Sequence, residues 1–135
     1  MLPVSWDTVR LFLHVTAATV WAGGQLTLAG LVPGLRQLSP DAPRAVARRF
    51  NVIAWPAYFV LVATGIWNLV AVSDLAFDTA YGRTLMAKVV VAVFSGLAAF
   101  VHSISRSKAG LAFWGAASGL SAVAALFLGV LLSQF

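Results

Sequence analysis

Four long apolar segments, separated by short polar connections, follow one another along the chain. A helix needs about 20 mostly apolar residues to cross a bilayer, and each segment is long enough. Backbone polar groups inside a membrane must bond one another, so the segments predict α-helices. The short connections predict a single domain over residues 1–135, an all-α membrane protein built as an antiparallel four-helix bundle. The predicted spans are residues 8–32, 51–73, 83–105 and 109–133.

The connection between the first two spans carries a further helix signal. Pro40 and Pro43 stand where a helix could begin. We therefore expect a short interfacial helix over about residues 41–50, running into the second span. Its polar side would carry Arg44, Arg48 and Arg49.

Composition supports the membrane assignment and removes several function classes. The chain is 61% hydrophobic and 10% charged, whereas a soluble domain averages about 45–50% and about 25%. The sequence pI near 10.9 reflects basic loops of a membrane protein, and we expect no nucleic acid partner. The absence of cysteine excludes disulfides, iron–sulfur clusters and thiolate metal sites. We expect an integral protein of the bacterial inner (cytoplasmic) membrane, with the lipid bilayer as its surroundings.

The basic residues predict the orientation of the bundle. Lys and Arg gather on the cytoplasmic side of membrane proteins. Only Arg10 and Arg83 flank the spans on one side, where they accompany three aspartates, so we expect both termini outside. The opposite side holds Arg36, Arg44, Arg48, Arg49, Arg106 and Lys108.

Polar side chains form one stripe on the first span and one on the third, at about 100° per residue. Ionisable groups facing lipid cost several kcal/mol, so we expect the two stripes to face each other or a common cavity. The stripe of the first span contains Arg10, His14, Trp21 and Gln25. The stripe of the third span contains Thr84, Lys88, Ser95 and His102.

Helical rise places three polar residues of different spans at a similar depth. His14 lies seven residues beyond Asp7, or ~10 Å, and Lys88 five residues beyond Arg83, or ~8 Å. Asn68, on the second span, reaches about the same level. A lone histidine can be a core residue satisfied by one hydrogen bond, but an ionisable residue inside a membrane is by default a functional candidate. We therefore predict an outer-leaflet site of His14, Lys88 and Asn68, closed from below by Trp21.

The second histidine does not join this site. His102 lies nineteen residues beyond Arg83, which is ~28 Å deep. One haem iron cannot be bridged by His14 and His102, because their depths differ by ~18 Å. We interpret His102 as an interfacial histidine near Arg106 and Lys108.

The segments "LHVTAATVWAGG", "FVLVATGIWNL" and "YGRTLMAKVVVAV" resemble the three signature segments of the copper-resistance D (CopD) domain. That pattern has a His before Trp-x-Gly-Gly, then a Thr-Gly, then Gly-Arg followed by Lys. The layout is also similar to that of HemJ-type protoporphyrinogen oxidases, in which such residues surround a porphyrin. The positions that match are His14, Trp21, Pro56, Ala57, Gly65, Trp67 and Lys88. After Trp21 the chain continues with "LTLAGLVPGLR" where those oxidases have a Tyr-Leu-Pro-Arg and Tyr-His run, which speaks against oxidase activity.

Three functions remain open from the sequence. The first is a site for haem b or another porphyrin, with His14 as iron ligand and Lys88 as second ligand or propionate partner. The second is copper transport or resistance, with His14 and Met86 as metal ligands, although Cu(I) prefers thiolates and thioethers and the chain has few. The third is a non-catalytic accessory subunit of a larger membrane complex. The spans contain no carboxylate, so we do not expect an enzyme.

Small residues spaced four apart suit close helix packing, within one chain or in a homo-oligomer or larger complex. They are Ala92 and Gly96 on the third span, and Gly115 and Gly119 on the fourth.

Overall fold

The computed structural model describes residues 1–72 and 75–135, and every regular element in these ranges is helical. The elements are α1 (Trp6–Ala18), the π-helix η1 (Thr19–Gly23), α2 (Gly24–Leu38), α3 (Ala42–Ala71), α4 (Ala80–Ile104) and α5 (Lys108–Leu132). Four helices are long and apolar enough to cross a membrane, because α1, η1 and α2 are continuous over Trp6–Leu38. The all-helical membrane fold predicted from the sequence is confirmed. The placement of both termini outside stays a prediction.

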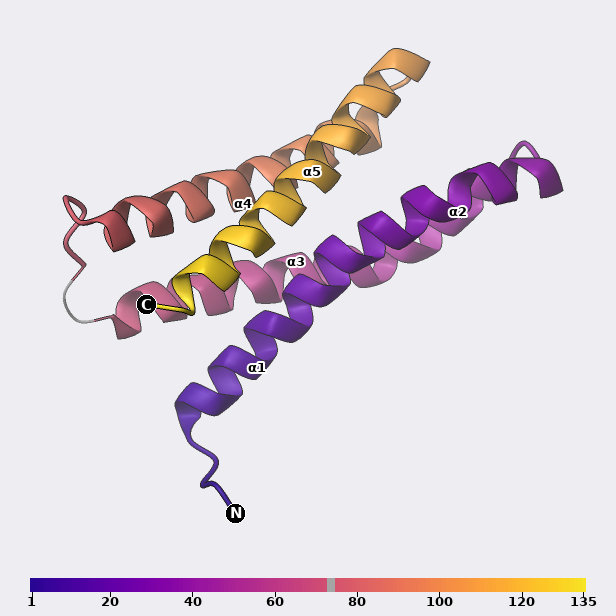
Figure 1. The fold of residues 1–135 in the computed structure, drawn as a ribbon. Coiled ribbons are helices and arrows are strands. Elements are labelled where there is room, and N and C mark those ends of the chain that lie inside the picture. The colour runs from indigo at the N-terminus through magenta and orange to yellow at the C-terminus, as the bar shows by residue number, and fades with distance from the viewer. Residues whose placement is uncertain (73–74) are drawn as a thin grey trace. The chain divides into compact units, whose positions relative to one another are not determined.

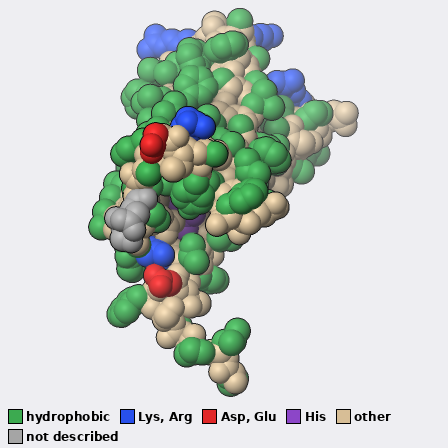
Figure 2. Space-filling view, turned by 60° about the vertical axis from the view of Figure 1, so that its left-hand side comes forward, with side chains coloured by type: hydrophobic (Ala, Val, Ile, Leu, Met, Phe, Trp, Pro, Cys, Tyr) green, Lys and Arg blue, Asp and Glu red, His purple; other side chains and the backbone are tan. Residues whose placement is uncertain are grey.

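The outward surface of these helices is apolar, as lipid contact requires. Large side chains such as Phe12, Phe59, Phe100 and Phe127 are more than half exposed. Hydrophobic side chains dominate the face seen in Figure 2, where charged groups are few. A water-soluble protein of this length would not expose so much apolar surface. The chain is an integral membrane protein whose surroundings are the lipid bilayer.

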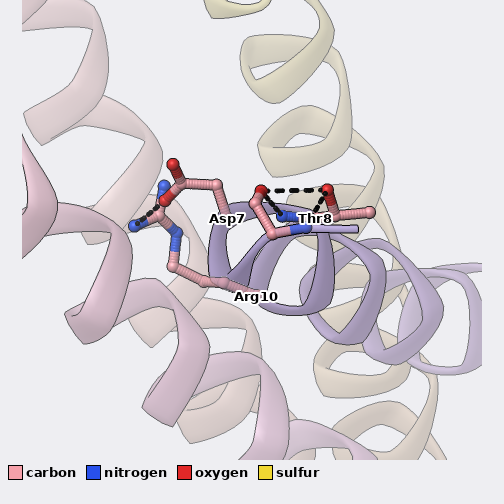
Figure 3. Close-up of polar contacts among 4 residues, drawn as sticks. Asp7, Thr8 and Arg10 are labelled. Carbon is pink, nitrogen blue, oxygen red and sulfur yellow. Dashed lines mark hydrogen bonds and ion pairs between the residues drawn. The ribbon is translucent and has the colours of Figure 1, made fainter. Parts of the chain in front are cut away.

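The chain forms two compact units, Met1–Ser73 and Asp74–Phe135. In the first unit, α1, η1 and α2 make one continuous rod that runs beside α3 (Figure 1). Ser5 caps the N-terminus of this rod: its hydroxyl accepts from the backbone N–H of Thr8, and the Thr8 hydroxyl accepts from the backbone N–H of Ser5 (Figure 3). Such reciprocal caps satisfy donors that a helix start leaves unpaired.

The π turn changes which residues of the first span share a face. A π-helix turn contains one residue more than an α-helix turn. Because one residue corresponds to about 100° of rotation, residues beyond Gly23 are rotated by about that angle from their positions on a regular α-helix. The predicted stripe from Arg10 to Gln25 assumed an uninterrupted α-helix. Its members before Thr19 keep their alignment, whereas Gln25 is displaced around the axis.

The second span and the predicted interfacial segment belong to one helix. Asp41 is the N-cap of α3, Pro43 lies in its first turn, and the helix continues through Pro56 to Ala71 without an end near residue 50. Residues 42–50 are therefore the opening turns of a 30-residue helix. A Cβ atom built on Gly24 would collide with the ring of Phe50, so glycine is what allows α2 and α3 to approach at this level.

The second unit is a hairpin of α4 and α5 held by small and polar residues. Ser95 and Ser118 are 1% and 2% exposed, and the hydroxyl of each donates to the backbone carbonyl of the other over 2.9 Å. Gly96 is also buried at this contact. Close approach of the backbones makes these reciprocal bonds feasible, as small residues at membrane helix interfaces allow.

Enlarging the glycine that faces His102 should destabilise this hairpin. A Cβ on Gly115 would lie 3.1 Å from both Cε1 and Nδ1 of that ring, so Gly115→Leu should lower the free energy of unfolding by about 1–3 kcal/mol through overpacking. Gly30→Leu is the control, because nothing lies within 4 Å of a Cβ there. Denaturant unfolding in detergent measures both, and equal stability of the two variants would contradict the packing described.

Candidate functional site

His14 lies between the two long helices of the first unit and is held by a residue of α3. Its Nδ1 is 2.9 Å from Oγ1 of Thr64, and Thr64 is 4% exposed. The Thr64 hydroxyl also lies 2.7 Å from the carbonyl of Val60, which can only accept, so we infer that its hydrogen is directed there. Because that hydrogen is used, the hydroxyl oxygen accepts from His14, which places the imidazole proton on Nδ1 and the ring lone pair on Nε2.

The residue after Thr64 gives the imidazole its space. A Cβ built on Gly65 would lie 3.7 Å from Cε1 of His14, so the ring packs close to the backbone of α3. Thr64 and Gly65 together position the ring. Sequence analysis did not assign Thr64 a role, although the Thr-Gly pair of the second span was a visible signal.

A second polar level lies one helical turn toward the N-terminus of α1. Arg10 precedes His14 by four residues on α1, and Asn68 follows Thr64 by four on α3. Because the helices are antiparallel, both fall at the next level of the interface. Arg10 binds Asp7 over 3.1 Å (Figure 3), with side chains 14% and 72% exposed. Nε of Arg10 and Oδ1 of Asn68 are buried and have no hydrogen-bond partner within residues 1–72 and 75–135.

Trp21 lies in the π turn, on the opposite side of His14 along the helix. It is 4% exposed, and its ring centroid is 4.5 Å from that of Tyr58 and 5.4 Å from that of Trp55. These aromatic rings form a packed layer of α3 and the first span. Whether this layer closes a ligand site below His14, as predicted, stays a prediction.

Lys88 and Met86 belong to the second unit. A Cβ on Gly129 would lie 3.1 Å from Nζ of Lys88, so the amine lies along α5. Met86 is 40% exposed and, with Arg83 and neighbouring apolar residues, lines an open cavity of about 470 Å³. His14 belongs to the other unit, so its predicted pairings with Lys88 and Met86 stay predictions.

The polar stripe of α4 makes several of its contacts with α5. Nδ1 of His102 donates to the carbonyl of Leu111 over 2.8 Å, since a carbonyl oxygen only accepts. Ser95 and Lys88 also contact α5. From the sequence, this stripe was expected to face the first span or a common cavity. The adjacent helix α5 was not considered as a hydrogen-bond partner. His102 thus has a structural contact that sequence analysis missed.

No group of three or more His, Cys, Asp or Glu side chains that could hold a metal ion occurs among the residues that the structure describes. As a metal ligand, the role predicted for it, His14 would offer one nitrogen, and a complete coordination shell would need donors of another kind or from elsewhere. Asn68 offers an amide oxygen one turn away, and Met86 a thioether.

Removing the hydroxyl of Thr64 should release the imidazole. In Thr64→Val the bond to Nδ1 is lost, at a cost of about 1 kcal/mol in unfolding free energy, and the fixed tautomer gives way to a mixture. Thr64→Ser keeps the hydroxyl and should keep the tautomer. Nitrogen-15 NMR of the imidazoles measures both, with His102 as internal reference. A His14 spectrum unchanged in Thr64→Val would refute the assignment of the proton to Nδ1.

Comparison with known proteins places this geometry in a family. Residues 44–132 match the family model of copper resistance protein D. The chain is also 32% identical over 102 residues to a protein described as copper transport protein CutJ, from Bacillus subtilis (strain 168). That alignment covers 72% of this chain and 19% of the relative, so the chain spans about a fifth of the relative's length. No solved structure matches the chain significantly.

The family match includes α4, α5 and most of α3, and with them Thr64, Asn68, Met86 and Lys88. It begins after the helix that carries His14, so the role of His14 rests on its geometry. Since the matched region is about two thirds of the sequence, the protein belongs to the copper resistance protein D family.

Proposed function

We propose that this protein handles copper in the membrane and that Nε2 of His14 is a ligand of the ion it passes on. Family membership and the name of the Bacillus relative support copper as the cargo. The relative's bacterial source also supports the bacterial inner membrane as the location. The observation that carries the proposal is the bond between Nδ1 of His14 and Thr64.

This bond prepares the imidazole for a metal ion in two ways. It keeps the proton on Nδ1, so the lone pair lies on Nε2, and it fixes the orientation of the ring. Metal-binding histidines almost always donate their other ring N–H to an acceptor, commonly a carboxylate, a backbone carbonyl or water, and the Thr64 hydroxyl takes that place here. Imidazole nitrogen is a suitable ligand for copper in either oxidation state.

The small number of donors suits a cargo better than a resident metal. His14 is one ligand, and Met86, Asn68 and Lys88 are the candidates for the others. A site with few strong ligands binds an ion weakly enough to release it, which transfer requires. Because the chain spans about a fifth of its relative, a longer protein or a second copy could also supply ligands. A role as accessory part of a larger membrane complex stays a prediction.

Haem is the second candidate, and the position of Arg10 favours it. The guanidinium lies one helical turn from His14, on the same face of α1, and its side chain is 14% exposed. A partly buried guanidinium pairs well with a carboxylate, and haem carries two propionates. Nε2 of His14 would then be the protein nitrogen that holds the iron. Lys88 stays a candidate for a second ligand or a second propionate partner.

The two histidines of the chain allow a matched test. In the copper measurement, detergent-purified protein is titrated with Cu(I) in competition with a chromogenic chelator. In the haem measurement, the protein is produced in cells supplied with a haem precursor, and absorption spectra of the purified protein are recorded in the oxidised and dithionite-reduced states. His14→Ala should lose the bound copper, or the Soret band if the ligand is haem. His102→Ala should retain it, because Arg106 and Lys108 follow His102 closely in the sequence and their charges disfavour a cation.

Copper bound equally by His14→Ala and the unaltered chain, with no Soret band in either, would overturn the role of His14. Loss of copper in both histidine variants would indicate a diffuse site rather than the one proposed. A Soret band that depends on His14 would select haem over copper.

A further inference from the structure

The Arg10–Asn68 level is the middle step of a polar ladder in the α1–α3 interface. From the exposed end inward the ladder passes Asp7, then Arg10 beside Asn68, then His14 beside Thr64. Asp7 and His14 are seven residues apart, or ~10 Å along the helix. Asp7 is 72% exposed and Arg10 14% exposed, so the ladder begins at the surface and continues into the interface.

Two atoms of this ladder require partners that the described side chains do not supply. Nε of Arg10 is a buried donor and Oδ1 of Asn68 a buried acceptor, and both lack a hydrogen-bond partner among the described residues. Leaving such a group unsatisfied costs about 1–3 kcal/mol, and more if the group is charged. Buried polar groups in proteins are therefore satisfied, and where side chains do not reach them ordered water does.

Ordered water can serve these atoms. A water oxygen accepts from Nε of Arg10, and a water hydrogen is donated to Oδ1 of Asn68. The ion pair with Asp7 offsets the charge of the guanidinium, so a cation approaching along this route would meet little net repulsion. The next polar group inward is the imidazole of His14.

We propose that the Arg10–Asn68 level is a hydrated vestibule, through which water and small hydrated ions reach His14 from the Asp7 end of the first unit. The inference rests on the proposed function only in taking His14 as the destination. Its test uses neither copper nor haem, so the vestibule and the ligand role of His14 can fail separately.

The natural absence of cysteine makes accessibility measurable without altering the background. Single variants Asn68→Cys, Ile66→Cys and Val70→Cys are treated, in reconstituted vesicles, with a positively charged methanethiosulfonate, which reacts with the thiolate. Ile66 and Val70 bracket Asn68 in depth on the outer face of α3 and are 56% and 79% exposed. A thiolate forms in water and not in hydrocarbon, so Asn68→Cys should react at least about tenfold faster than either control.

Reaction of Asn68→Cys no faster than the lipid-facing controls would overturn the vestibule. A second measurement applies if that variant does not fold, as judged by circular dichroism and gel filtration. Diethylpyrocarbonate modifies accessible imidazoles, and Asn68→Leu should slow the modification of His14 several-fold relative to His102 in the same molecule. An unchanged ratio of the two rates would refute the proposal.

Discussion

An imidazole placed inside a membrane segment must have its N–H satisfied, and this requirement organises the first unit. On α3 the hydroxyl of Thr64 is bonded to the imidazole, and this hydroxyl is itself held by the carbonyl of Val60. The antiparallel register that brings these groups together also sets Arg10 beside Asn68 and Trp21 beside Tyr58. This hydrogen bond, together with the aromatic layer around Trp21 and the close approach of Gly24 to Phe50, therefore fits one register of the helix pair.

In the second unit, buried polar groups are also satisfied by hydrogen bonds between the paired helices, but with different residues. His102 donates to a backbone carbonyl of α5, and the two serines exchange bonds with the opposite backbone. Hydrophobic contact gives little preference among registers in a membrane, since lipid tails are as apolar as the helices. Polar groups, few and specific, therefore determine how each hairpin of helices is paired.

Sequence reasoning was reliable for what depends on hydrophobic length. The presence of four membrane-length helices, the helical class and the family follow from long apolar segments and three short motifs, and each is confirmed. The exact bounds of the spans stay predictions. The partner of His14 was not predicted, because helical rise gives depth but does not say which side chain of the facing helix points inward. The estimate of depth from helical rise placed Asn68 at the level of His14. The residue bonded to His14 is instead Thr64, one helical turn away on α3. The π turn was also missed, because nothing in "TVWAG" distinguishes five wide-turn residues from five ordinary ones.

That π turn separates the segment carrying His14 from the segment packed on Phe50. A π-helix and an α-helix differ by one residue in their hydrogen-bond register, so the wide turn can move along the rod as successive N–H groups change acceptor. Each such move would rotate the residues that it passes by about 100° while the helix ends stay in place. The first span is thus a helix whose two segments, on either side of the π turn, keep separate rotational registers, so the face that carries His14 and the face packed on Phe50 are set independently.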